Sequence, residues 1–199
     1  MSRPSEIRDF WLDGVDSQGV PSASTLQRWF AGGSEVDDAI RVRFGDDVER
    51  ALAGDLDDWA EEPASRFALT ILLDQFPRNL FRGTARSYAG DPRALALVKD
   101  LVGRGLDADQ PAIERYFLYL PFEHSEALAD QNRSLELFQE LFESAPEEAR
   151  DHLKGALEWA ERHRVVIERF GRFPSRNQAL GRTSTPEELA FLESTPAGF

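Results

Sequence analysis

The sequence contains no cysteine, and only one methionine and two lysines among its 199 residues. Without cysteine the chain has no disulfide, no thiolate metal site and no cysteine nucleophile. Long apolar runs are also missing, because the most apolar stretch, residues 67–73, is interrupted by Thr70 and is far shorter than the roughly 20 residues of a membrane span. The N-terminal stretch lacks the apolar segment of a secretory signal. These absences predict a soluble cytoplasmic protein with no membrane partner.

Motifs for the common cofactors and nucleophiles are absent too. The chain has no GxGxxG, GxxxxGK[ST], GxSxG or HExxH pattern. His152 and His163 lie eleven residues apart on one predicted helix, roughly 16 Å at 1.5 Å per residue, so they cannot hold one metal ion. We therefore expect no cofactor and no metal site.

Charge is unevenly spread along the chain. The net charge of −13 opposes binding to nucleic acid phosphates. Residues 35–62 contain eleven acids against three arginines, whereas residues 162–182 contain six arginines against Glu168 alone. The sequence therefore predicts no nucleic-acid partner, and it draws attention to the arginines near the C-terminus.

Apolar residues recur at helical spacing along most of the chain, and no run alternates with period two. The fold class is therefore predicted to be all-α, as a single domain over residues 1–199, with short connections that favour antiparallel helical hairpins. The four tryptophans are expected to lie mostly in the core. Eight helices and a short ninth are predicted, at residues 4–13, 24–31, 35–53, 63–76, 91–104, 109–119, 125–143, 146–172 and 186–194.

Capping residues and prolines set the predicted helix ends. Helix starts are indicated by the capping acid in Asp91-Pro92 and by capping-box spacing at Ser144–Glu147 and Thr185–Glu188. The residue before a proline is disfavoured in the α conformation, which predicts helix ends near Phe76, Leu120 and Phe173.

Two stretches nearly 100 residues apart share an unusual pattern, DQFPRNLFRGT from Asp74 and RFGRFPSRN from Arg169. In each, an aromatic-proline pair precedes arginine and asparagine. One interpretation is structural: the asparagines bond turns, and the arginines cap helix ends or pair with acids. The other is a pocket in which guanidinium groups bind a carboxylate or phosphate. Its predicted ligand-binding residues are Arg78, Asn79, Arg82, Glu123, His124, Arg172, Arg176 and Asn177.

The stretch YLPFEHSE, residues 119–126, carries the remaining candidate chemistry. Glu123 and His124 follow a proline and precede a new helix, so they could simply stabilise that helix start. Alternatively, His124 pairs with Glu123 or Asp74 as an acid–base pair.

Together, DQFPRNLFRGT, YLPFEHSE and RFGRFPSRN resemble a bacterial family of uncharacterised function, and the resemblance covers nearly the whole chain. It implies a tetratricopeptide-like, right-handed array of antiparallel helical hairpins, and it implies no activity, cofactor or catalytic residue. Members often carry histidine in the FPxRN motif where this chain has Ser175, so no catalytic role is expected at that position.

Three functions remain open. The first hypothesis is a binding protein for a small anionic molecule or a peptide or protein partner, because a helical array offers a concave face. The second is an enzyme that uses His124 with Glu123 or Asp74 on an anionic substrate. The third is a structural or oligomer-forming protein. The sequence leaves the oligomeric state undetermined.

Overall fold

The computed structural model describes residues 3–31 and 33–195. Within them the regular structure is helical, apart from one isolated antiparallel bridge between Val15 and Pro21, which confirms the all-α prediction. Every predicted helix range overlaps an observed helix. The helices are α1 Arg3–Trp11, α2 Ala23–Leu26, α3 Ser34–Ala53, α4 Pro63–Thr70, α5 Phe76–Leu80, α6 Asp91–Gly103, α7 Ala112–Glu123, α8 Leu128–Ser144, α9 Glu147–Phe170 and α10 Pro186–Ser194.

Two of the three predicted proline stops are wrong. Helix α4 continues through a π-helical turn, Ile71–Gln75, directly into α5, which contains Pro77. The wider turn accommodates a proline that has no N–H to donate and would clash in a regular helix. Helix α7 likewise continues past Pro121 to Glu123, in a segment that is buried on all sides. Only α9 stops before its proline, at Phe170, where Gly171 takes a left-handed φ of 67°.

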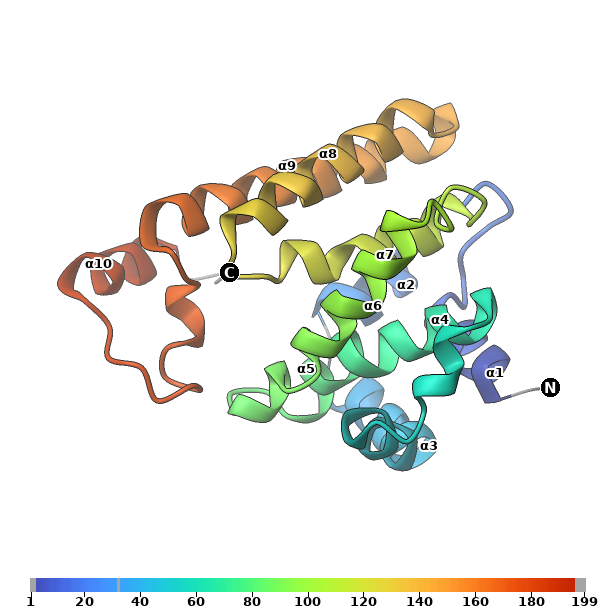
Figure 1. Ribbon diagram of the computed structural model, residues 1–199, viewed down its shortest axis with the longest axis horizontal. Coiled ribbons are helices and arrows are strands. Elements are labelled where there is room, and N and C mark those ends of the chain that lie inside the picture. The colour runs from blue at the N-terminus through green and yellow to red at the C-terminus, as the bar shows by residue number, and fades with distance from the viewer. Residues whose placement is uncertain (1–2, 32, 196–199) are drawn as a thin grey trace.

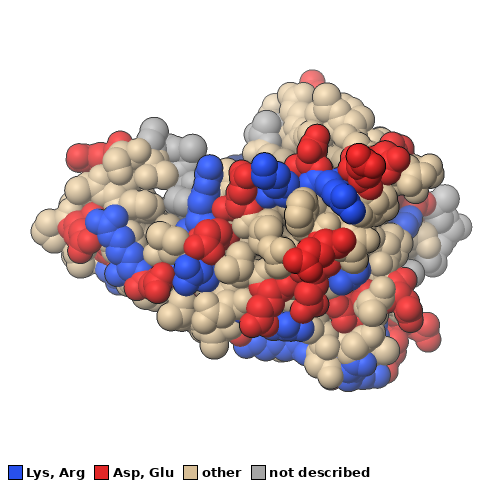
Figure 2. Space-filling view, turned by 90° about the horizontal axis from the view of Figure 1, so that it is seen from above, with Lys and Arg blue, Asp and Glu red and all other residues tan. Residues whose placement is uncertain are grey.

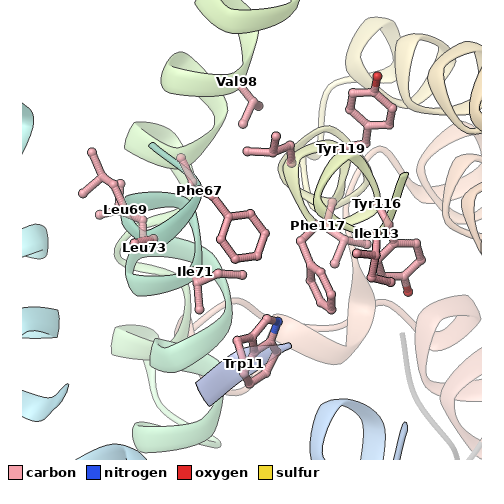
Figure 3. Packing of buried hydrophobic residues seen from close by; sticks show 14 of the residues in the cluster. Trp11, Phe67, Leu69, Ile71, Leu73, Val98, Ile113, Tyr116, Phe117 and Tyr119 are labelled. Carbon is pink, nitrogen blue, oxygen red and sulfur yellow. The ribbon is translucent and has the colours of Figure 1, made fainter. Parts of the chain in front are cut away.

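The main core lies where α1, α4 and α7 meet. Figure 3 shows Trp11, Phe67 and Phe117 converging there, and the Trp11 and Phe117 rings pack edge-to-face with centroids 5.6 Å apart. Trp11 and Trp29 are buried, as expected. Trp159 is 44% exposed on α9, so the expectation that it belongs to the core is wrong.

Helix pairing follows the chain in one half of the molecule only. Helices α7, α8 and α9 are successive neighbours, with α8 and α9 forming a long antiparallel hairpin (Figure 1). In the other half α1 packs on α4, and α3 packs on α5. The tetratricopeptide-like order expected from the resemblance therefore stays a prediction. No described helix is long and apolar enough to cross a membrane.

The segment after α9 folds back beside the end of α7 and leads into α10 (Figure 1). It rests on a second, smaller apolar cluster formed by Val166, Ile167 and Phe173, with Phe170 and Phe191 against it. This return places the second arginine motif near the first.

Candidate functional site

A cavity of about 280 Å³ lies where α5, the last turn of α7 and the segment after α9 approach one another. Among the residues that the structure describes, its lining includes three arginines and two histidines but no carboxylate. The lining residues are Arg78, Arg82, Gly83, Ser87, Tyr88, His124, His163, Phe173 and Arg176.

Asp91 joins the two arginine motifs. Both terminal nitrogens of Arg78 donate to its carboxylate, at 2.8 and 3.0 Å, and Arg176 Nη1 donates to Asp91 Oδ2 at 3.2 Å. The predicted role of Asp91 as a helix cap is wrong, because Gly90 is the capping residue and Asp91 belongs to the first turn of α6. Two arginines 98 residues apart in the chain thus share one acid.

Arg176 is held on all sides. Its Nη2 donates to the backbone carbonyl of His124 at 2.9 Å. Its guanidinium carbon lies 4.7 Å from the ring centre of Tyr88 and 4.5 Å from that of Phe173. With a side chain only 10% exposed, this arginine has few alternative conformations. Its position is therefore fixed by the fold.

His124 pairs with Asp74, which is one of the two predicted pairings. The His124 Nδ1 atom lies 2.7 Å from Asp74 Oδ1, and Asp74 is fully buried. Burial favours the protonated form of Asp74, but Arg78 and His124 outweigh this effect and hold the pKa of Asp74 below its usual range. An ionised carboxylate only accepts, so His124 Nδ1 carries the proton.

Burial and the nearby Arg78 lower the pKa of His124, an effect that Asp74 opposes. The imidazole is therefore neutral at pH 7, and its Nε2 has a lone pair. Nε2 makes no hydrogen bond to any described residue, and His124 lines the cavity.

Glu123 does not reach the cavity, although it is adjacent to His124 in sequence. Its side chain is buried and does not line the cavity, and its Oε1 lies 3.4 Å from His163 Nδ1. Burial and the neighbouring Asp74 raise the pKa of Glu123 to about 8, so this carboxyl is mostly protonated at pH 7. His163 donates from Nδ1 to the carbonyl of Trp159, and burial lowers its pKa to about 3.

Three other predicted site residues lie elsewhere. Asn79 donates to Asp37. Arg172 binds the carboxylate of Glu188, to which Asn177 also donates. Arg82 reaches the cavity edge while pairing with Asp37. The structural interpretation of the motifs therefore fits Asn79, Arg172 and Asn177, whereas Arg78, Arg82, His124 and Arg176 converge on the cavity.

The C-terminal arginines are extensively paired, which the uneven charge of the sequence does not reveal. Figure 2 shows basic and acidic side chains interspersed over one face of the molecule. Arg182, for example, makes two hydrogen bonds to Glu126, which also accepts from the backbone of Phe173. This region is a set of ion pairs. In the part of the chain that the structure describes, no three His, Asp or Glu residues are arranged to hold a metal ion.

Residues 7–196 match the model of a family described as bacterial protein of unknown function, DUF924. The chain belongs to this family. A solved structure, that of the protein of unknown function ATU0120 from Agrobacterium tumefaciens, is 39% identical to it, with a TM-score of 0.81. The match covers 96% of this chain and 97% of the other. A comparison with curated proteins gave no match.

Several lining residues of this DUF924 chain could not be predicted from the sequence. Tyr88 lies in a short 3₁₀ turn and belongs to no motif. The proline pattern predicts only a helix end near Phe173, and helical spacing excludes His163 and His152 from one metal site without assigning His163 another role. The acidic residue Asp91 was the one usable signal in the sequence. An acid at a helix start can also pair with arginines, and that pairing would have indicated where the two motifs meet.

Proposed function

We propose that the cavity binds a small ligand through an anionic group such as a phosphate, sulfate or carboxylate. The observation that supports this proposal is the lining itself. In a chain of net charge −13, the cavity presents three arginines and two histidines and no acid from the described residues. The surrounding negative charge disfavours anions elsewhere on the surface, which gives the site selectivity.

Arg78 and Arg176 are held in place by the fold and still have N–H groups that could donate hydrogen bonds to an anion. Their terminal nitrogens are occupied by Asp91 and by the carbonyls of Asp74 and His124. The Nε atom of each makes no hydrogen bond to any residue between 3–31 or 33–195. A guanidinium held in place loses little conformational entropy when an anion binds, and its fixed donors match oxyanions in geometry.

The cavity volume favours a small molecule over a peptide. At about 280 Å³ the cavity lies at the lower end of the usual range for ligand pockets. The rings of Tyr88 and Phe173 and the hydroxyl of Ser87 offer contacts for the organic part of such a ligand. A peptide or protein partner on another face stays a prediction.

Binding can be tested with sulfate in an isothermal titration of three proteins. Wild type should bind, and Arg176→Lys should bind about tenfold or more weakly, because lysine keeps the charge but loses the planar fork. Arg169→Lys is the matched control, since Arg169 is exposed and pairs with Glu187 outside the cavity. Equal affinities for all three proteins would refute the proposal.

The Asp74–His124 pair favours catalysis as a second candidate function. A neutral imidazole that is oriented by a buried carboxylate is suited to act as a general base. Here it lines the same cavity as the arginines that would hold an anionic substrate. On this hypothesis a phosphate or carboxylate ester would be turned over by wild type. The turnover would be lost in His124→Gln and reduced in Asp74→Asn, while sulfate would still bind.

A further inference from the structure

The three arginines that line the cavity are already balanced by acids. Arg78 pairs with Asp74 and Asp91, the latter of which it shares with Arg176. Arg82 pairs with Asp37. Three positive charges therefore face three negative ones before a ligand arrives. A dianion entering this half-buried space adds charge that these paired arginines do not neutralise, and uncompensated buried charge is costly.

A neutral base that faces the cavity can compensate this charge by taking up a proton. The lining contains two such bases, His124 and His163. His163 donates from Nδ1 to the neutral carbonyl of Trp159, and the carboxyl 3.4 Å from the same nitrogen, that of Glu123, is mostly protonated. His124 instead has the ionised Asp74 at its Nδ1 atom, with Asp74 Oδ1 2.7 Å away. An imidazolium at position 124 is thus stabilised on one side by Asp74 and on the other by the anion.

We propose that the anion binds together with a proton, which His124 takes up on Nε2. This inference rests on the proposed function and specifies its chemistry. The proton comes from solvent, the new Nε2–H donates to an oxygen of the anion, and Asp74 stays ionised against Nδ1–H. The site therefore selects anions by coupling their binding to protonation, and their affinity increases as the pH falls.

The groups around His124 come from every element that packs there. They are Asp74 in the π-helical turn, Arg78 in α5, Tyr88 in the 3₁₀ turn, Asp91 in α6, Glu123 in α7, His163 in α9, and Arg176 after it. The acids Asp74 and Asp91 are ion-paired, and both arginines keep their charge at every relevant pH. Burial raises the pKa of Glu123 to about 8, so this carboxyl titrates near neutral pH. The Glu123→Gln variant removes this titration, so proton uptake measured with it can be assigned to His124.

The experiment is a sulfate titration of the full chain at pH 7 in two buffers of different ionisation enthalpy. Sulfate is a dianion at this pH, so any proton taken up must bind to the protein. We expect close to one proton per sulfate and an affinity that increases about tenfold per unit decrease in pH. Glu123→Gln and His152→Gln should retain this uptake, because neither residue lines the cavity.

His124→Gln decides the assignment. The amide of the substituted side chain cannot be protonated, so sulfate should bind more weakly and without proton uptake. Sulfate binding by wild type without proton uptake, or unchanged uptake in His124→Gln, would overturn this inference and leave the proposed function intact. Failure of sulfate to bind wild type would overturn both.

Discussion

Asp91 does not line the cavity, but it partly neutralises two of the arginines that do. It accepts hydrogen bonds from Arg78 and Arg176, and its side chain is only 16% exposed. Removing its charge leaves two guanidinium groups with less compensation. The same residue therefore stabilises the fold and limits how strongly the cavity attracts an anion.

Asp91→Asn should separate these two roles. We expect the free energy of unfolding to fall by about 2 kcal/mol, between the values typical of exposed and buried ion pairs, and sulfate affinity to rise. Chemical denaturation and sulfate titration measure the two effects. Asp100→Asn is the control, because Asp100 is exposed and pairs with Arg104 one helical turn away. Unchanged stability together with weaker sulfate binding would contradict this account of Asp91.

Glu123 should make stability depend on pH. Its pKa in the folded state, about 8, lies above the ordinary value of 4.5, so the folded state holds the proton more tightly than the unfolded state. Stability from this group is therefore lost as the pH rises toward 8. The three histidines have lowered pKa values and oppose this trend only below about pH 6.5, because above it they are neutral in both states.

Between pH 6.5 and 8, wild type should lose up to about 1.4 kcal/mol of unfolding free energy per pH unit. Glu123→Gln, which resembles the protonated acid, should show no such loss. Denaturant unfolding at several pH values tests this. A wild-type profile as flat as that of the variant would mean that Glu123 is ionised in the folded protein.

At the scale of elements, helix positions could be predicted from periodicity, but the effect of two prolines could not. Pro77 and Pro121 lie in segments buried enough for packing to override their local preference. Capping spacing alone does not decide which residue caps a helix, because the same side chains also bond to groups outside their own helix start. The box at Thr185 is confirmed, whereas Ser144 bonds to carbonyls of the preceding helix instead of capping the next.

Gly90 lets α6 approach the π-helical turn. Its φ of −87° suits any residue, so glycine is required here by space. A Cβ atom at position 90 would lie 2.1 Å from the carbonyl oxygen of Leu73. This close approach brings Asp91 within reach of Arg78.

Gly90→Ala should therefore destabilise the fold by about 1–3 kcal/mol or more, as overpacking against backbone does. Gly45→Ala is the matched control, because Gly45 lies inside α3 with no described atom near its Cβ direction. That change should stabilise the helix by up to about 1 kcal/mol. Urea unfolding of both variants checks the pair, and equal stabilities would show that α6 can shift freely.

At the scale of the whole molecule, the cavity exists because the chain after α9 returns to the first half of the structure. The main core extends from Ile7 to Ala160, whereas the smaller cluster holds this last segment. The sequence indicates that residues of the two arginine motifs could line one pocket. It could not show that Asp91 would join them, or that the two asparagines would turn away to Asp37 and Glu188, because such partners depend on packing between distant helices.

Our central proposal is that this cavity binds anions selectively. The most direct measurement is a side-chain NMR titration with sulfate that follows the arginine Nε–H and histidine ring signals. The account predicts saturable shifts of Arg78, Arg176 and His124, with the exposed Arg169 and the distant His152 unchanged. Shifts spread evenly over the exposed arginines, or saturable shifts that leave Arg176 and His124 unaffected, would contradict it.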